Sequence, residues 1–127
     1  MRIAGFIVVI DSYLVRLGLV SILNRIHGIR VLKEFGPGDP FMAYLKSHSV
    51  DYLIISQSEF DRSLDFFVSK PDLLEKTVLI HDGQGEGPGP GSEQHNTHSI
   101  IHLQEGKESI IRKIQGLLDP KLNSDPE

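Results

Sequence analysis

Three short runs of apolar residues constrain the fold of this chain more than any other feature. They span residues 3–10, 52–56 and 77–81, and each gives way to polar residues or to a turn. The first run is rich in β-branched side chains and stops at Asp11-Ser12. Strands that are apolar on both faces are typical of a parallel sheet covered by helices. The runs therefore predict buried strands in a parallel sheet.

Amphipathic segments separate these runs. Residues 13–27 predict a helix that Asp11 or Ser12 caps, and Gly28 is a natural stop for it. One stripe of this helix carries, at helical spacing, Leu14, Leu17, Gly18, Ser21 and Ile22. A polar–apolar alternation over residues 29–35 predicts the next strand.

The rest of the chain continues the alternation of strands and helices. Asp39-Pro40 predicts an N-cap followed by proline at the first position of a helix that reaches about residue 48. Further helices are expected at residues 60–69 and 105–118, and a fifth strand at residues 100–103. In the last helix the inward positions are Ile110, Ile111, Ile114 and Leu117.

Strands joined by right-handed crossovers predict an α/β fold with a flavodoxin-like, five-stranded parallel sheet of order 2-1-3-4-5. In that architecture ligands bind beyond the carboxyl ends of the strands. The residues that end the strands are therefore the candidate site, and they are Ile10, Asp11, Ser56, His81 and Leu103.

Residues 82–92 interrupt this pattern, because they hold five glycines and two prolines. Glycine costs a helix interior about 1 kcal/mol and proline about 3 kcal/mol per position. A Gly/Pro-rich loop is therefore expected where the alternation requires a fourth helix. No phosphate cradle is expected there, since prolines remove backbone donors and no helix follows.

Composition excludes several classes of function. The absence of cysteine excludes disulfide scaffolds, thiolate metal sites and cysteine nucleophiles. With 13 basic and 17 acidic residues, this segment is not expected to grip nucleic-acid phosphates itself. No apolar run has the length of a membrane span, so a cytoplasmic protein without membrane contact is expected. Residues 1–118 are interpreted as one domain and residues 119–127 as a polar tail or interdomain linker.

Three stretches of the sequence carry a resemblance to a known family. The stretch VVIDSYLVRLGLVSIL resembles the start of a response-regulator receiver domain of the LuxR-type, NarL-like branch, through Leu14-Val15-Arg16 and Gly18-Leu19. DPFMAYLKSHSVDYLIIS is similar to the family's second helix and third strand, with Asp51 at its usual place. SIIHLQEGKESIIRKIQ resembles the family's last strand and helix. The resemblance covers residues 3–118 without gaps.

The resemblance also implies where phosphorylation chemistry would lie. A working receiver holds Mg²⁺ with two acidic residues after the first strand and is phosphorylated on an aspartate that ends the third. Here those positions are Ile10, Asp11 and Ser56. The family's Thr/Ser is His81 and its lysine is Leu103. Only Asp11 keeps the expected chemistry, so we predict a degenerate pseudo-receiver that is not an enzyme, is not phosphorylated, and carries no cofactor or metal.

Histidines offer a competing hypothesis near the same strand ends. A zinc site could draw on imidazoles and one carboxylate, namely His81, His95, His98, His102 and Asp82. Their spacing matches no standard zinc pattern, so metal binding is not our prediction. A pH-responsive histidine cluster is a further alternative.

The function predicted from these features is regulatory. The chain is interpreted as the receiver-like part of a transcription regulator whose DNA-binding domain follows Glu127, acting as a homodimer through its first and last helices or through a signalling protein partner. An alternative is a small-molecule-sensing or protein-interaction module that uses the altered pocket near Ile10, Ser56 and Leu103. A flavin- or nucleotide-binding enzyme is disfavoured, because the turn at residues 11–14 lacks suitable phosphate donors.

Overall fold

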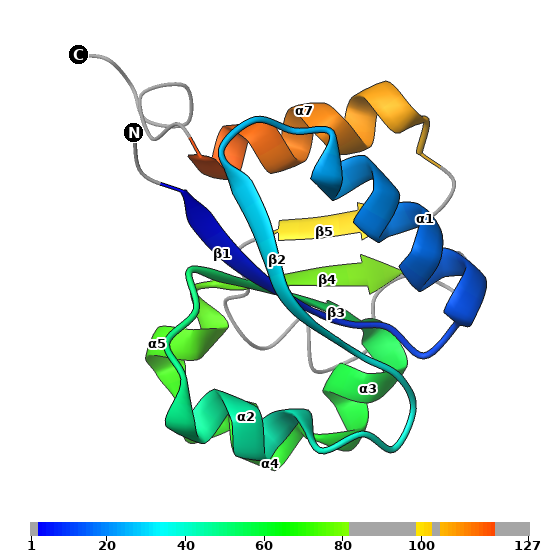
Figure 1. Ribbon diagram of the computed structural model, residues 1–127. Helices are drawn as coiled ribbons and strands as arrows, with labels where there is room; N and C mark the ends of the chain where they lie inside the picture. Colours follow the sequence, from blue (N-terminus) through cyan, green and yellow to red (C-terminus); the bar gives the residue numbers. More distant parts are fainter. Residues whose placement is uncertain (1–2, 82–98, 103–104, 119–127) are drawn as a thin grey trace.

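The computed structural model describes residues 3–81, 99–102 and 105–118, which form a five-stranded parallel sheet flanked by helices (Figure 1). The order β2-β1-β3-β4-β5 is the one predicted from the sequence. The strands are β1 (Ala4–Val9), β2 (Ile29–Phe35), β3 (Tyr52–Ser56), β4 (Thr77–His81) and β5 (Ser99–His102). The Gly/Pro-rich stretch expected to replace a helix, and the tail 119–127, lie outside the described residues.

Helices cover both faces of the sheet (Figure 1). One face carries α1 (Tyr13–Asn24) and α7 (Lys107–Leu118). The other carries α2 (Phe41–Ser47), α3 (Gln57–Arg62), α4 (Leu64–Val68) and α5 (Pro71–Leu74). None of the helices in the described ranges is long and apolar enough to cross a membrane.

Two hydrophobic cores explain why the central strands read as continuous apolar runs. Along β1, Phe6 and Val8 enter the core beneath α1 and α7, whereas Ile7 and Val9 enter the core on the opposite face. Successive side chains of a strand point to opposite faces, so a strand covered on both sides needs apolar residues at every position. All of β4, from Thr77 to His81, is buried in the same way.

The buried face of α1 differs from the predicted stripe. Leu14 is 76% exposed and Leu17 is 52% exposed, whereas Leu19 and Leu23 are buried against the sheet. The helix is apolar on most of its sides, so helical spacing alone offers more than one apolar stripe. Contact with the sheet decides between the stripes, and that contact depends on the angle at which the helix leaves β1.

The ends of α1 follow the predicted signals in part. Ser12 is the N-cap, because its Oγ accepts a hydrogen bond from the Val15 N–H at 3.3 Å. The helix ends at Asn24, short of the predicted residue 27. Gly28 then adopts a φ of +91°, a left-handed conformation that suits glycine and that turns the chain into β2.

The start of α2 is shifted from the prediction by one position. Pro40 is the N-cap, and it makes no side-chain capping bond. Asp39, predicted to be the cap, instead accepts a hydrogen bond from the Gly36 N–H at 2.7 Å and closes the preceding turn. An aspartate beside glycine and proline can serve either role, since both are short-range bonds to backbone N–H groups.

The predicted helix at residues 60–69 is three short helices instead. The first, α3, begins at Gln57, directly after β3. Ser63 separates α3 from α4, and Pro71 opens α5 shortly after the position at which the predicted helix ends. Proline at the first helical position loses no intrahelical bond, so a helix can start there.

Candidate functional site

Four of the five predicted site residues meet at the carboxyl edge of the sheet. Ile10 and Asp11 follow β1, Ser56 ends β3 and His81 ends β4. The pairing registers align Val9 with Ile55 and Ser56 with Ile80, so these strand ends lie at nearly the same height. Leu103 lies outside the described residues, as do His95, His98 and Asp82.

Ile10 belongs to the hydrophobic core and not to a polar site. Its side chain is 1% exposed and lies in the cluster that holds Val8, Leu19 and Ile54. Its backbone is also fixed, because its N–H donates to the Phe35 carbonyl at 3.1 Å. A packed aliphatic side chain therefore stands where the resemblance calls for a carboxylate.

Asp11 is engaged by its neighbours. Its carboxylate Oδ2 accepts a short hydrogen bond from the Ser58 hydroxyl, and its N–H donates to Ser56 Oγ at 3.4 Å. The carboxylate thus joins the end of β1 to the first turn of α3. Asp11 is not the helix cap, a role that Ser12 fills.

Ser56 is buried to 7% exposure at the end of β3. In the part of the chain that the structure describes, no carboxylate or imidazole hydrogen-bonds to its hydroxyl, whose partner is the Asp11 N–H. A serine hydroxyl attacks phosphorus or carbon only when a base removes its proton. The described surroundings of Ser56 provide structural contacts and no base.

Arg16 is a site residue that sequence reasoning missed. Its Nη1 donates to the Ile10 carbonyl at 2.7 Å, and its Nε lies 3.8 Å from Glu34 Oε1. The guanidinium also packs on Gly36, where a Cβ would come within 2.9 Å of Nη1. The only sequence signal is Gly36 itself, because a glycine in the loop after β2 leaves room for a long side chain.

The site does not fit Mg²⁺. A magnesium ion requires oxygen ligands in near-octahedral geometry. Ile10 offers a methyl surface, the Asp11 carboxylate is bonded to Ser58, and the Arg16 cation is held at the end of β1. Within residues 3–81, 99–102 and 105–118, no three His, Cys, Asp or Glu side chains converge as metal ligands.

The ends of β4 and β5 carry a different group. His81 pairs in register with His102, and their ring centroids are 5.4 Å apart with planes at 66°. His81 is 5% exposed and His102 is half-buried. Of the four histidines proposed from the sequence, these two are the ones that the described residues bring together.

A carboxylate fixes the turn after β5. Glu105 precedes α7, which begins at Lys107, so the predicted helix start at residue 105 is early. Its Oε2 accepts hydrogen bonds from the His102 N–H at 2.9 Å and from Lys113 Nζ at 2.7 Å, and its Oε1 accepts one from Ser109 at 2.6 Å. Burial would raise the pKa of Glu105, but these bonds outweigh it and lower the pKa to about 2.

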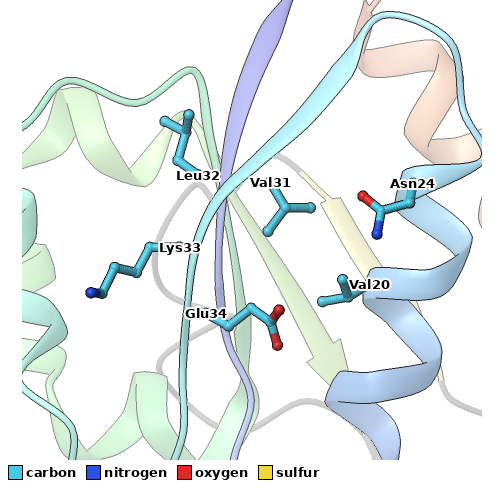
Figure 2. A pocket seen from close by; sticks show the side chains of 6 residues that line it. All are labelled: Val20, Asn24, Val31, Leu32, Lys33 and Glu34. Atoms are coloured by element: carbon cyan, nitrogen blue, oxygen red, sulfur yellow. The ribbon is translucent and has the colours of Figure 1, made fainter.

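A hollow between α1 and β2 is separate from these strand ends (Figure 2). It is lined by Val20, Asn24, Val31, Leu32, Lys33 and Glu34. In Figure 2, Lys33 points away from the side of the strand on which Glu34, Asn24 and Val20 lie. Glu34 also faces the Arg16 cation. Because Lys33 points away and Glu34 faces Arg16, these two charged groups do not converge on one ligand in the hollow.

Solved structures of similar fold are receiver domains. The response regulatory domain of protein mrkE from Klebsiella pneumoniae superposes with a TM-score of 0.69 at 14% identity, over 94% of this chain and 99% of that one. The response regulator RcsB of Salmonella typhimurium gives a TM-score of 0.74 at 15% identity, over 93% of this chain and 60% of that chain. The chain has the fold of a response-regulator receiver domain.

The receiver domain of NarL from Mycobacterium tuberculosis extends this result to the branch that the sequence resembles. It superposes with a TM-score of 0.67 at 15% identity, over 91% of this chain and 95% of that one. No family model matches the sequence, and no curated protein matches it either. The receiver fold is therefore shared with these structures at a sequence identity of 14–15%.

Proposed function

We propose that this receiver-fold chain is a regulatory module that works without aspartyl phosphorylation and without enzymatic activity. The observation that carries the proposal is the packing of Ile10 in the core at the first acidic position, next to a buried Ser56. Phosphoryl transfer needs a metal ion and positive groups to offset the charge on the transferring oxygens. One carboxylate, already bonded to Ser58, does not provide such a metal site.

The output of such a module lies in its surfaces. The N-terminal half of α1 exposes three large apolar side chains, which are Tyr13, Leu14 and Leu17. Surface of this kind marks a place where another macromolecule binds. We assign it to a homodimer contact that α7, which lies beside α1 on the same face of the sheet (Figure 1), would extend. A signalling protein that binds the same surface is the other partner we consider.

DNA binding is assigned to a domain outside this chain. The chain spans 64% of the RcsB chain that was solved as a complex with DNA, so that protein has a further region with no counterpart here. A net charge of −4 for residues 1–127 agrees with a regulatory part that leaves phosphate contacts to such a region. The full regulator would then bind DNA as a dimer whose spacing this module sets.

Labelling with acetyl phosphate tests the first part of the proposal. The purified chain, incubated with Mg²⁺ and radiolabelled acetyl phosphate, should incorporate no label. Asp11→Asn removes the carboxylate and Ser56→Ala removes the hydroxyl that could accept a phosphoryl group at the strand ends, so these two variants serve as controls. Stoichiometric labelling of the unaltered chain that either variant abolishes would refute the proposal.

Sedimentation tests the second part. Leu14→Glu and Leu17→Glu place charges on the exposed face of α1 and should convert a dimer to a monomer. Val68→Glu is the matched control, because Val68 is also a large exposed apolar residue but lies on α4, on the other face of the sheet. A dimer that survives both α1 substitutions, or a chain that is monomeric from the start, would contradict the assignment.

A pocket for a small apolar ligand gains no support from the described residues. The Ile10 side chain is surrounded by Val8, Leu19 and Ile54, and Ser56 is buried. Core packing therefore occupies this part of the candidate site. We therefore favour recognition of macromolecules over sensing of a metabolite at this point.

A further inference from the structure

The inference concerns the two histidines at the ends of β4 and β5. His81 and His102 occupy paired register positions on adjacent parallel strands, so the sheet holds both side chains at one height and on one face. Their ring centroids are 5.4 Å apart, and the planes are inclined at 66°. Both strands end here, at the edge where this architecture places its ligands.

This spacing matches two imidazoles on one metal ion. A transition-metal ion lies about 2.0–2.1 Å from an imidazole nitrogen, which places two ring centroids about 5 Å apart at a tetrahedral angle. The observed separation of the centroids, 5.4 Å, is close to that value. The backbone need not move, because the register already pairs the two residues.

The backbone on both sides of the pair is fixed. His81 lies on a strand that is buried along its whole length. The His102 N–H is bonded at 2.9 Å to the Glu105 carboxylate, which Lys113 and Ser109 also hold. Ligands on rigid strands keep their geometry better than ligands on loops.

We propose that His81 and His102 bind one divalent transition-metal ion of the Zn²⁺ class, with water at the remaining coordination positions. Imidazole ligands select zinc, nickel and copper ions, whereas Mg²⁺ and Ca²⁺ require oxygen ligands. No group of three ligating side chains converges within the described ranges, so these two histidines are the ligands that those ranges supply. The inference goes beyond the proposed regulatory function and does not depend on it.

Calorimetric titration with Zn²⁺ tests the proposal. At neutral pH the chain should bind one Zn²⁺ ion, and Mg²⁺ should not compete. His81→Gln and His102→Gln should each weaken binding by at least roughly tenfold, the lower end of what even outer-sphere partners of a metal ligand contribute. His48→Gln is the matched control, since His48 is exposed and stacks on Tyr44 at the end of α2, and it should bind as the unaltered chain does.

A second measurement avoids substitution of the buried histidine. In the unaltered chain, one equivalent of Zn²⁺ should shift or broaden the imidazole NMR signals of His81 and His102 while those of His48 stay in place. A chain with both His95→Gln and His98→Gln should still bind one ion. The proposal fails if the unaltered chain binds no Zn²⁺, if either His81→Gln or His102→Gln binds as tightly as before, or if the double substitution abolishes binding.

Discussion

The ends of β1 and β3 lie at the same edge of the sheet as the ends of β4 and β5, yet the two regions carry different kinds of side chain. At β1 and β3, the side chains are Ile10, buried in the core, and Ser56, whose Oγ accepts a hydrogen bond from the Asp11 N–H at 3.4 Å. At β4 and β5, two imidazoles face each other and a carboxylate closes the turn. The end of β1 places a core side chain at the position of a strand-end ligand, whereas the ends of β4 and β5 place two imidazoles there.

This contrast shows that one edge of the sheet can hold both a packed core residue and a pair of imidazoles. The resemblance calls for a carboxylate at position 10, and a buried carboxylate would need a metal ion or another cation to neutralise its charge. Ile10 carries no charge and adds apolar burial instead. Burial of the Ile10 side chain stabilises the fold at this strand end. The ends of β4 and β5 do not join the apolar core in this way. His81 and His102 carry ring nitrogens, which need hydrogen-bond or metal partners even when they are buried.

The largest expected effect comes from restoring a carboxylate at the β1 end. Ile10→Asp should destabilise the domain by about 3–5 kcal/mol, because the new charge would be buried without a partner. Urea denaturation followed by circular dichroism measures the change. Leu14→Asp is the control: it also exchanges an aliphatic side chain for aspartate, but at an exposed position of α1, so its cost should stay within about 0.5 kcal/mol.

A loss of stability of less than about 1 kcal/mol for Ile10→Asp would contradict the contrast between the packed end of β1 and the polar ends of β4 and β5. It would mean that the end of β1 is open to water or to cations, and therefore that a metal site can be rebuilt there with a single substitution. The same variant would then bind Mg²⁺ together with Asp11, and acetyl phosphate labelling should be repeated on it with Ser56→Asp added.

The strands and their order could be predicted from the sequence because the physics that fixes them is local. A central strand is apolar on both faces, and that pattern is visible at residues 53–55 and 78–80. Strand order then follows from crossover handedness and the number of strands. The same local logic failed for α1, where Leu14 and Leu19 are equally apolar and only packing against the sheet separates them.

The candidate site was predicted in position but not in its contacts. Strand ends identify Ile10, Asp11 and Ser56, since the chain direction alone determines which edge carries a ligand. The role of Arg16 depends on the space above Gly36, twenty residues away in sequence, which no helical pattern reveals. The pairing of His81 with His102 depends on strand register, which in turn depends on how β4 and β5 hydrogen-bond.

A smaller effect is expected at the β5 end. Glu105→Gln keeps the shape of the side chain but loses the charge that three donors share, so we expect a loss of about 1.5–3 kcal/mol, the range for hydrogen bonds to charged groups. Chemical denaturation measures it. Glu108→Gln is the control in the first turn of α7, where the side chain is exposed, and it should change stability by less than about 0.5 kcal/mol. Equal effects of the two variants would show that the hydrogen bonds to the Glu105 carboxylate are not a fixed part of the fold.

The stabilisation by Glu105 should depend on pH. Its pKa is lowered from 4.5 to about 2 in the folded chain, so the carboxylate stabilises the fold fully above pH 4.5, and this contribution is lost as the pH falls from 4.5 towards 2. The difference in unfolding free energy between the unaltered chain and Glu105→Gln should therefore shrink over that window. Denaturation series at neutral pH and at several acidic values would measure it. A difference that stays constant down to pH 2 would contradict the assignment of the charge.

The smallest expected change in stability tests whether Arg16 is held at the end of β1. Gly36→Ala should cost about 1 kcal/mol, because the new Cβ would lie 2.9 Å from Arg16 Nη1 and must push the guanidinium from the Ile10 carbonyl. In an Arg16→Ala background the same substitution should cost almost nothing, which gives a coupling energy of about 1 kcal/mol in a double-mutant cycle.

Gly38→Ala supplies the matched control for this cycle. Gly38 has a φ of +79° and no neighbour within 4 Å of an added Cβ, so the cost of alanine there comes from its own backbone. That cost should be the same with or without Arg16. Coupling at Gly36 and none at Gly38 would place the guanidinium against the end of β1 in solution. Absence of coupling at Gly36 would mean that Arg16 swings free, and the Ile10 carbonyl would then be open to another donor or to a cation.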